Sequence, residues 1–149
     1  MLHPTSDEQI VEIGPGTGLR SLQVARLLRT GELTVVDVRQ ELLDHVQRRA
    51  AQRGVRLRAV RADATSLPLD DATFDAGYLV NVLGEIPNRP ALLGELRRVL
   101  KPGGRLIVGE FADRHHLPLG KLVRLANGSK LRYVRHTGAP LAYHAEFVA

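Results

Sequence analysis

Three glycines at alternate positions mark the stretch of this sequence with the clearest chemical use. Gly14, Gly16 and Gly18 follow the apolar run 10–13, and helix-like sequence begins at once at Leu19. Glycine permits a positive φ and lets a ligand approach the backbone closely, and the first N–H groups of a helix are free to meet an acceptor. The stretch therefore predicts a ligand-binding loop between a strand and a helix.

Polar side chains follow the next predicted strands. Asp37 closes the β-branched run 33–38, nineteen positions after Gly18, Asp63 closes the run 55–64, and Asn81 follows the run 74–80. Ligands of open α/β sheets lie outside the carboxyl ends of the strands. A carboxylate at the end of the second strand can accept from both hydroxyls of a ribose, so we expect a ligand that carries a nucleoside, most simply adenosine.

Strand and helix patterns alternate over the first 111 residues, and this alternation must position the glycines and carboxylates. Strands are expected at 10–13, 33–38, 55–64, 74–80 and 105–111, with helices at 19–28, 40–53 and 90–100. Such an order predicts an α/β fold with a doubly wound, mainly parallel open sheet of Rossmann-like type.

The last third of the chain changes character. A helix at 117–126 is followed by two strand patterns, 131–135 and 141–148, around a turn at 137–140. A turn of this kind joins antiparallel neighbours, so we expect an antiparallel strand pair at the C-terminal edge of the sheet. We expect 141–148 to be an exposed edge strand. Such an edge can pair with a second copy of the chain, so a homodimer is an expectation.

The glycine spacing separates two nucleotide-containing cofactors. A dinucleotide fingerprint needs glycine at its sixth position, where this chain has Leu19, which disfavours a nicotinamide-dependent oxidoreductase. The chain instead resembles the class I methyltransferases that use S-adenosylmethionine, in particular the small-molecule group of ubiquinone and menaquinone biosynthesis enzymes. The resemblance covers 10–111 and rests on the motifs VEIGPGTG (11–18), VD (36–37), DA (63–64), LPL (67–69), FD (74–75) and LKPGGRL (100–106).

The resemblance also implies roles for individual residues in binding S-adenosylmethionine. The glycine loop would pass against the methionine end of the cofactor, Asp37 would hold the ribose diol, and Asp63 and the Ala64 backbone would meet the adenine ring. Glu12 would organise the loop or contact the amino-acid end of the cofactor. The expected cofactor-binding set is Glu12, Gly14, Gly16, Gly18, Asp37, Asp63, Ala64 and Asn81.

Groups for the acceptor are expected after the fourth and fifth strands. A base near the acceptor would come from Glu85, His115 or His116, and these are the candidate catalytic residues. Relatives often carry a histidine pair where this chain has Gly84-Glu85, and this departure weakens the argument for carrying their acceptor chemistry over to this chain. The histidines lack metal-ligand spacing, and no metal site is expected.

Length and composition bound the other possibilities. The 149 residues indicate one domain, the absence of cysteine fits a reducing compartment, and no apolar run is long enough for a membrane span, so we expect a cytoplasmic protein. The net charge is +5, but the arginines of 48–61 occur without interleaved aromatics. A solvated helix face is favoured over a polyanion surface, and a nucleic-acid partner is not expected.

The resemblance further implies helices ahead of the first strand that cover the cofactor, whereas only nine residues precede Ile10. The expected single domain, residues 1–149, therefore lacks the usual lid. Its site is open, or the lid comes from a partner or second copy, or the chain is a fragment of a longer one.

Three functions remain open. The first is methyl transfer from S-adenosylmethionine to a small-molecule acceptor. The second is a cofactor-binding module or partner subunit without activity. The third is an RNA or other nucleic-acid methyltransferase, disfavoured because Asn81 is followed by Val82-Leu83 rather than by the Pro-Pro-aromatic sequence used on flipped bases.

Overall fold

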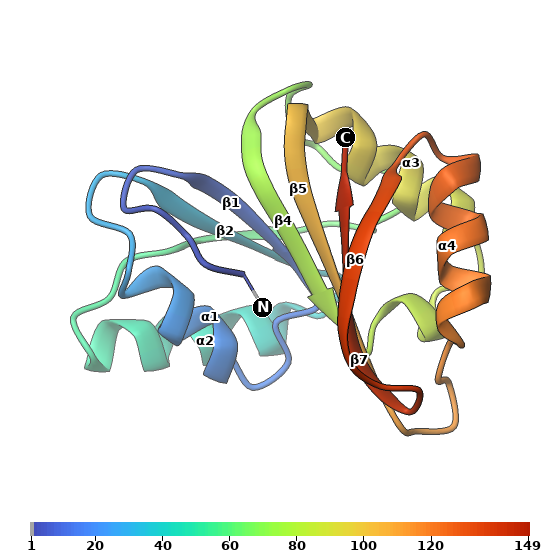
Figure 1. The fold of residues 1–149 in the computed structure, drawn as a ribbon. Helices are drawn as coiled ribbons and strands as arrows, with labels where there is room; N and C mark the ends of the chain where they lie inside the picture. The colour runs from blue at the N-terminus through green and yellow to red at the C-terminus, as the bar shows by residue number, and fades with distance from the viewer. Residues whose placement is uncertain (1) are drawn as a thin grey trace.

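A single seven-stranded sheet organises the chain in a computed structural model that describes residues 2–149 (Figure 1). Its strands lie in the order β3-β2-β1-β4-β5-β7-β6. In chain order they are β1 (Gln9–Ile13), β2 (Glu32–Asp37), β3 (Arg58–Arg61), β4 (Phe74–Val80), β5 (Leu100–Phe111), β6 (Arg132–Ala139) and β7 (Ala142–Val148).

The pairing directions confirm the expected fold class. Strands β3, β2, β1, β4 and β5 are parallel neighbours, whereas β5 pairs with β7 and β7 with β6 in antiparallel fashion. Strand order reverses between β1 and β4, where the chain crosses from one half of the sheet to the other. A crevice outside the carboxyl ends of these strands is the expected ligand position for such a sheet.

Helices cover both faces of the sheet (Figure 1). The helices α1 (Leu19–Ala25) and α2 (Gln40–Gln52) pack on one face, and α3 (Arg89–Val99) and α4 (Leu119–Gly128) on the other. The apolar run of β2 follows from this burial, because Val35 points to the α1 and α2 side and Val36 to the α3 and α4 side. A central strand buried on both faces cannot alternate with polar residues.

The antiparallel pair is present, but the expectation that 141–148 forms an exposed edge strand is wrong. Strand β7 lies between β5 and β6 and forms hydrogen bonds with both, so β6 is the edge. The reason is burial: Tyr143, Ala145 and Phe147 of β7 alternate into the core, whereas most of β6 is exposed. The argument for a homodimer through 141–148 therefore fails.

Several boundaries also differ from the sequence expectation, among them the start of β5, which is Leu100 rather than position 105. Helix α1 ends at Ala25 rather than near position 28, because the N–H groups of Arg29, Thr30 and Gly31 all donate to the Ser6 carbonyl and form a turn. Strand β3 is confined to Arg58–Arg61. The segment 81–88 between β4 and α3 contains one short 3₁₀ helix, η1 (Leu83–Glu85).

Candidate functional site

A cavity of about 540 Å³ lies at the carboxyl ends of β1, β2, β3 and β4. This volume falls within the range of small-molecule sites, roughly 300 to 1,000 Å³. Residues from four separate loops line it, which agrees with the single crevice expected from the sequence. The predicted residues that line it are Gly14, Gly16, Asp37, Asp63, Ala64, Asn81 and Glu85.

The glycine loop needs glycine for two different reasons. A β-carbon at Gly14, where φ is +68°, would overlap the Val82 side chain, so glycine allows the loop to pack against the segment after β4. Gly16 has φ +53° and nothing within 4 Å of a β-carbon position, so its backbone faces the open cavity. Gly18 does not line the cavity and instead packs against Val46 of α2.

Asp37 forms part of the cavity wall at the end of β2. Its Oδ1 atom accepts a hydrogen bond of 2.9 Å from the Arg39 N–H and lies 3.5 Å from the Arg39 Nε atom. The side chain is only 7% exposed. These contacts hold the carboxylate in a fixed direction at the cavity, as a group that accepts from a diol must be held.

Asp63 and Ala64 form the neighbouring wall at the end of β3. The Oδ1 atom of Asp63 accepts from the Thr65 N–H at 2.8 Å and from the Thr65 hydroxyl at 2.7 Å. These hydrogen bonds from Thr65 hold the pKa of Asp63 below its usual range, so the group is a carboxylate at neutral pH. An ionised, locally braced acceptor at this position suits an amino group of a bound base.

Asn81 occupies a strained backbone position at the end of β4. Its φ is +54°, in the left-handed region that asparagine tolerates better than most residues. The Asn81 N–H donates to the Gly109 carbonyl, and its Oδ1 accepts from the Phe111 N–H at 2.7 Å. Asn81 therefore fixes the ends of β4 and β5 relative to each other and lines the cavity.

Glu12 lies beneath the glycine loop rather than in the cavity. It is 4% exposed, and burial raises its pKa to about 7, with Ser21, Tyr78 and Arg20 opposing the shift. Its Oε2, the Ser21 hydroxyl and the Tyr78 hydroxyl are buried without a hydrogen-bond partner among the described residues. This polar cluster under the loop fits the expected role of Glu12 as a residue that organises the loop, which stays a prediction.

The three candidate catalytic residues separate in the structure. Glu85 is exposed at the end of η1 and lines the cavity, whereas His115 and His116 do not. His115 is exposed and accepts from Arg114 Nε at 2.9 Å through its Nε2. The His116 ring meets Tyr143 edge-on at 5.8 Å, turned toward the core. Of the three candidate catalytic residues, Glu85 is therefore the one whose position lets it reach a ligand in the cavity.

A close backbone contact nevertheless brings the two loops side by side. A β-carbon at Gly84 would overlap the His115 carbonyl oxygen, so η1 can pack against the segment after β5 only with glycine at this position. The buried Glu110 accepts from the Leu117 N–H at 3.1 Å, and Tyr143 donates to the Leu117 carbonyl. Burial raises the pKa of Glu110. Glu110, which the sequence places at the end of the fifth strand beside the candidate catalytic residues, does not line the cavity and instead fixes the segment that carries both histidines.

Sequence reasoning missed several residues that line the cavity. The signal that could have found Val38, Arg39 and Ala62 is their place directly after a strand end, whereas Thr65, Pro87 and Asn88 lie further along their loops. Val38 is the clearest case, because a valine that is 54% exposed one residue after a buried strand offers an apolar surface to a flat ring.

Two further features are absent from residues 2–149. No group of three or more histidine or acidic side chains there could hold a metal ion. None of the helices in this part of the chain has the length and apolar character needed to cross a membrane.

Comparison with known families gives one match over most of the chain. A family model described as a methyltransferase domain matches residues 11–108. A ubiquinone/menaquinone biosynthesis C-methyltransferase from Azotobacter vinelandii is 37% identical over 117 residues, which are 76% of this chain and 46% of that protein. The chain spans about half the length of the curated relatives it matches.

Solved structures share the fold. A S-adenosylmethionine-dependent methyltransferase from Aquifex aeolicus superposes with a TM-score of 0.89 at 16% identity, over 97% of this chain and 83% of that one. The [4+2]-cyclase SpnF superposes with a TM-score of 0.82 at 26% identity, over 89% of this chain and 54% of that one. The similarity in fold therefore covers more of this chain than residues 11–108, which the family model matches.

Proposed function

The chain belongs to the methyltransferase domain family, and on this premise we propose that it transfers a methyl group from S-adenosylmethionine to a small-molecule acceptor. The resemblance found in the sequence is confirmed, as are the class of enzyme and S-adenosylmethionine as the cofactor of that class. The roles of individual residues and the nature of the acceptor belong to the proposal.

One observation carries the proposal. The cavity at the ends of β1, β2, β3 and β4 combines the open backbone at Gly16, the braced carboxylates Asp37 and Asp63, and the apolar Val38. A nucleoside with a cationic side chain finds in it an acceptor for its ribose hydroxyls, an acceptor for its amino group and an apolar wall. These donor and acceptor types fit S-adenosylmethionine.

The bound cofactor supplies a methyl group already activated by a sulfonium. The acceptor atom forms its bond to this carbon with its own electron pair, and the sulfur keeps the pair of the bond that breaks, so the protein mainly positions the reactants and excludes water. Where the acceptor must lose a proton, Glu85 is the proposed base, since it is the candidate that lines the cavity.

For the acceptor we propose an aromatic carbon of a quinone precursor. The support is the printed activity of relatives, C-methyltransferases of ubiquinone and menaquinone biosynthesis that are up to 37% identical to this chain. An aromatic ring activated by an ionised hydroxyl is a carbon nucleophile, and its ring proton leaves after methylation, which gives the base a task.

Calorimetric titration with S-adenosylmethionine and with its demethylated product tests cofactor binding. Asp37→Ala removes the proposed ribose acceptor and should weaken binding by about 1 to 3 kcal/mol, roughly 5- to 150-fold in Kd. Asp70→Ala is the matched control, because Asp70 is exposed and does not line the cavity. No binding at millimolar cofactor, or equal losses in both variants, would overturn the proposal.

A cofactor-binding module without methyl transfer is the second candidate. It is favoured by the position of His115 and His116 outside the cavity, which leaves Glu85 as the one candidate base there among the three. The cyclase SpnF also shares this fold. Transfer of labelled methyl to a demethylated quinone precursor separates the two candidates, and transfer that Glu85→Gln reduces without loss of cofactor affinity supports the enzyme.

A further inference from the structure

A second and larger hollow, of about 1,190 Å³, lies at the opposite end of the sheet from the cofactor cavity. Gln9 and Glu32, the first residues of β1 and β2, line it, whereas Asp37 at the other end of β2 lines the cofactor cavity. Five residue steps along a strand span about 17 Å. One small ligand therefore cannot occupy both places.

Four arginines from two connections converge on this hollow. Arg26 and Arg29 come from the end of α1 and the turn after it, and Arg53 and Arg56 from the end of α2 and the connection after it. All four are exposed, and the one acidic residue that lines the hollow within the described chain is Glu32. The hollow therefore has a strong excess of positive charge.

These arginines also lack the ion pairs that other arginines of this chain form. Arg98, Arg105 and Arg135 lie within 2.8 Å of carboxylate oxygens, whereas none of the four around the hollow forms an ion pair within residues 2–149. Two other arginines of the stretch 48–61 lie at the opposite end of the sheet. Arg49 donates to the Thr17 carbonyl of the glycine loop, and Arg61 donates to the Val38 carbonyl. The basic stretch 48–61 thus divides between the two ends of the sheet.

Backbone hydrogen bonds fix both walls of the hollow. On one side the Ser6 carbonyl accepts from three successive N–H groups, those of residues 29 to 31, at 2.7 to 3.0 Å. On the other side the Ala50 carbonyl accepts from the N–H groups of Arg53 and Val55, both at 3.0 Å, around Gly54 with φ +62°. The backbones that carry these arginines are therefore held in place, and binding of a ligand would order only their side chains.

We propose that this arginine-rimmed hollow is a binding site for a small anion that carries two or more phosphate groups. Guanidinium groups bind phosphate oxygens through paired, charge-assisted hydrogen bonds, and several on one concave surface can engage more than one phosphate. No aromatic side chain lines the hollow within the described residues, so it offers no platform on which nucleic-acid bases would stack. This inference does not depend on the proposed methyl transfer.

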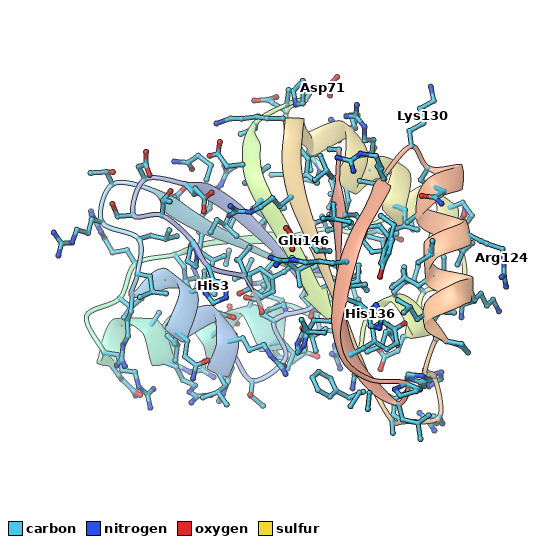
Figure 2. The ribbon with its side chains drawn as sticks, in the orientation of Figure 1. His3, Asp71, Arg124, Lys130, His136 and Glu146 are labelled. Carbon is cyan, nitrogen blue, oxygen red and sulfur yellow. The ribbon has the colours of Figure 1, made fainter. Side chains whose placement is uncertain are left out.

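Inorganic tripolyphosphate is the probe, titrated calorimetrically into the intact chain at low and at physiological ionic strength. Arg29→Gln/Arg53→Gln takes one arginine from each wall and should weaken binding about tenfold or more. The control Arg124→Gln/Arg132→Gln removes the same charge from exposed arginines outside the hollow. Arg124 projects from α4, on the side of the molecule away from α1 and α2 (Figure 2).

The control variant should change the affinity for tripolyphosphate by less than about twofold, since a distant charge acts only through a screened field. Tripolyphosphate should also leave the affinity for S-adenosylmethionine unchanged. No binding of tripolyphosphate at millimolar concentration, or equal losses in both double variants, would overturn the proposal. Binding of a single-stranded RNA or of phosphatidylglycerol vesicles through Arg29 and Arg53, without tripolyphosphate binding, would overturn it in favour of a polymer or membrane surface.

Discussion

Glu12 is a carboxyl group buried between the glycine loop, helix α1 and strand β4, beside the Ser21 and Tyr78 hydroxyls. Burial raises its pKa from 4.5 to about 7, so the folded protein holds the proton more tightly than the unfolded chain. The stabilising contribution is therefore complete below pH 4.5 and is lost as the pH rises through about 7.

Glu12→Gln removes this titration and keeps the shape of the side chain. Relative to the wild type, the variant should gain up to about 3 kcal/mol in free energy of unfolding between pH 4.5 and pH 8. Urea denaturation of the cofactor-free protein at both pH values measures the difference. Glu41→Gln, an exposed residue of α2, should show no such gain; a gain of the same size there would refute the assignment.

At the scale of single residues, the sequence predicted the glycines that a tight turn needs and the carboxylates that a ribose or an amino group needs. Gly14, Gly16, Asp37, Asp63 and their neighbours were found because few other residue types meet the needs of a turn or a ribose acceptor. Apolar wall residues such as Val38 were not, because valine at a strand end has no distinctive chemistry until its exposure is known. The distance of His115 and His116 from the cavity depends on how a loop folds, which spacing does not encode.

At the scale of elements, η1 and the segment after β5 depend on the contact at Gly84. Gly84→Ala places a carbon against the His115 carbonyl oxygen, a backbone atom that cannot rotate away, and should destabilise the protein by about 1 to 3 kcal/mol. Gly94→Ala is the matched control, because Gly94 lies in α3 with nothing within 4 Å of its β-carbon position.

The control should behave in the opposite way, with a gain of about 0.5 to 1 kcal/mol from the higher helix propensity of alanine. Thermal unfolding of both variants checks the pair. If the two variants were equally stable, η1 and the segment after β5 could move apart at little cost, and the prediction for Gly84→Ala would be wrong.

The parallel part of the sheet was predictable because apolar runs of four to seven residues alternate with amphipathic helices, a pattern with few solutions. The position of β7 was not. Both C-terminal segments have strand character, and a hairpin can dock on β5 through either of its strands. The pairing of β7 with β5, and the burial of Tyr143 and Phe147 against the exposure of β6, show which strand is inside.

At the scale of the whole molecule, β7 joins the parallel sheet to its edge strand. Phe147 is fully buried there, and Phe147→Ala should cost about 3 to 5 kcal/mol in free energy of unfolding. Leu141→Ala, in the exposed turn between β6 and β7, should change it by less than about 0.5 kcal/mol. Urea titrations followed by circular dichroism and by tyrosine fluorescence should coincide, because the two core clusters share the same strands.

Three expectations about the molecule in its surroundings stay predictions: a homodimer, a cytoplasmic location, and a cover for the cofactor from a partner or from further chain. Sequence composition supports the second, and the first no longer has the support of an exposed 141–148 edge. Analytical ultracentrifugation with and without cofactor would test the first.

The place of β7 between β5 and β6 also has a consequence for the order in which the chain can fold during synthesis. Strand β6 leaves the ribosome before β7, yet it touches the rest of the sheet only through β7. Until Ala142–Val148 has emerged, β5 lacks its outer neighbour and exposes an unpaired edge. A nascent chain stalled before β7 therefore exposes a strand edge at which it can pair with other chains.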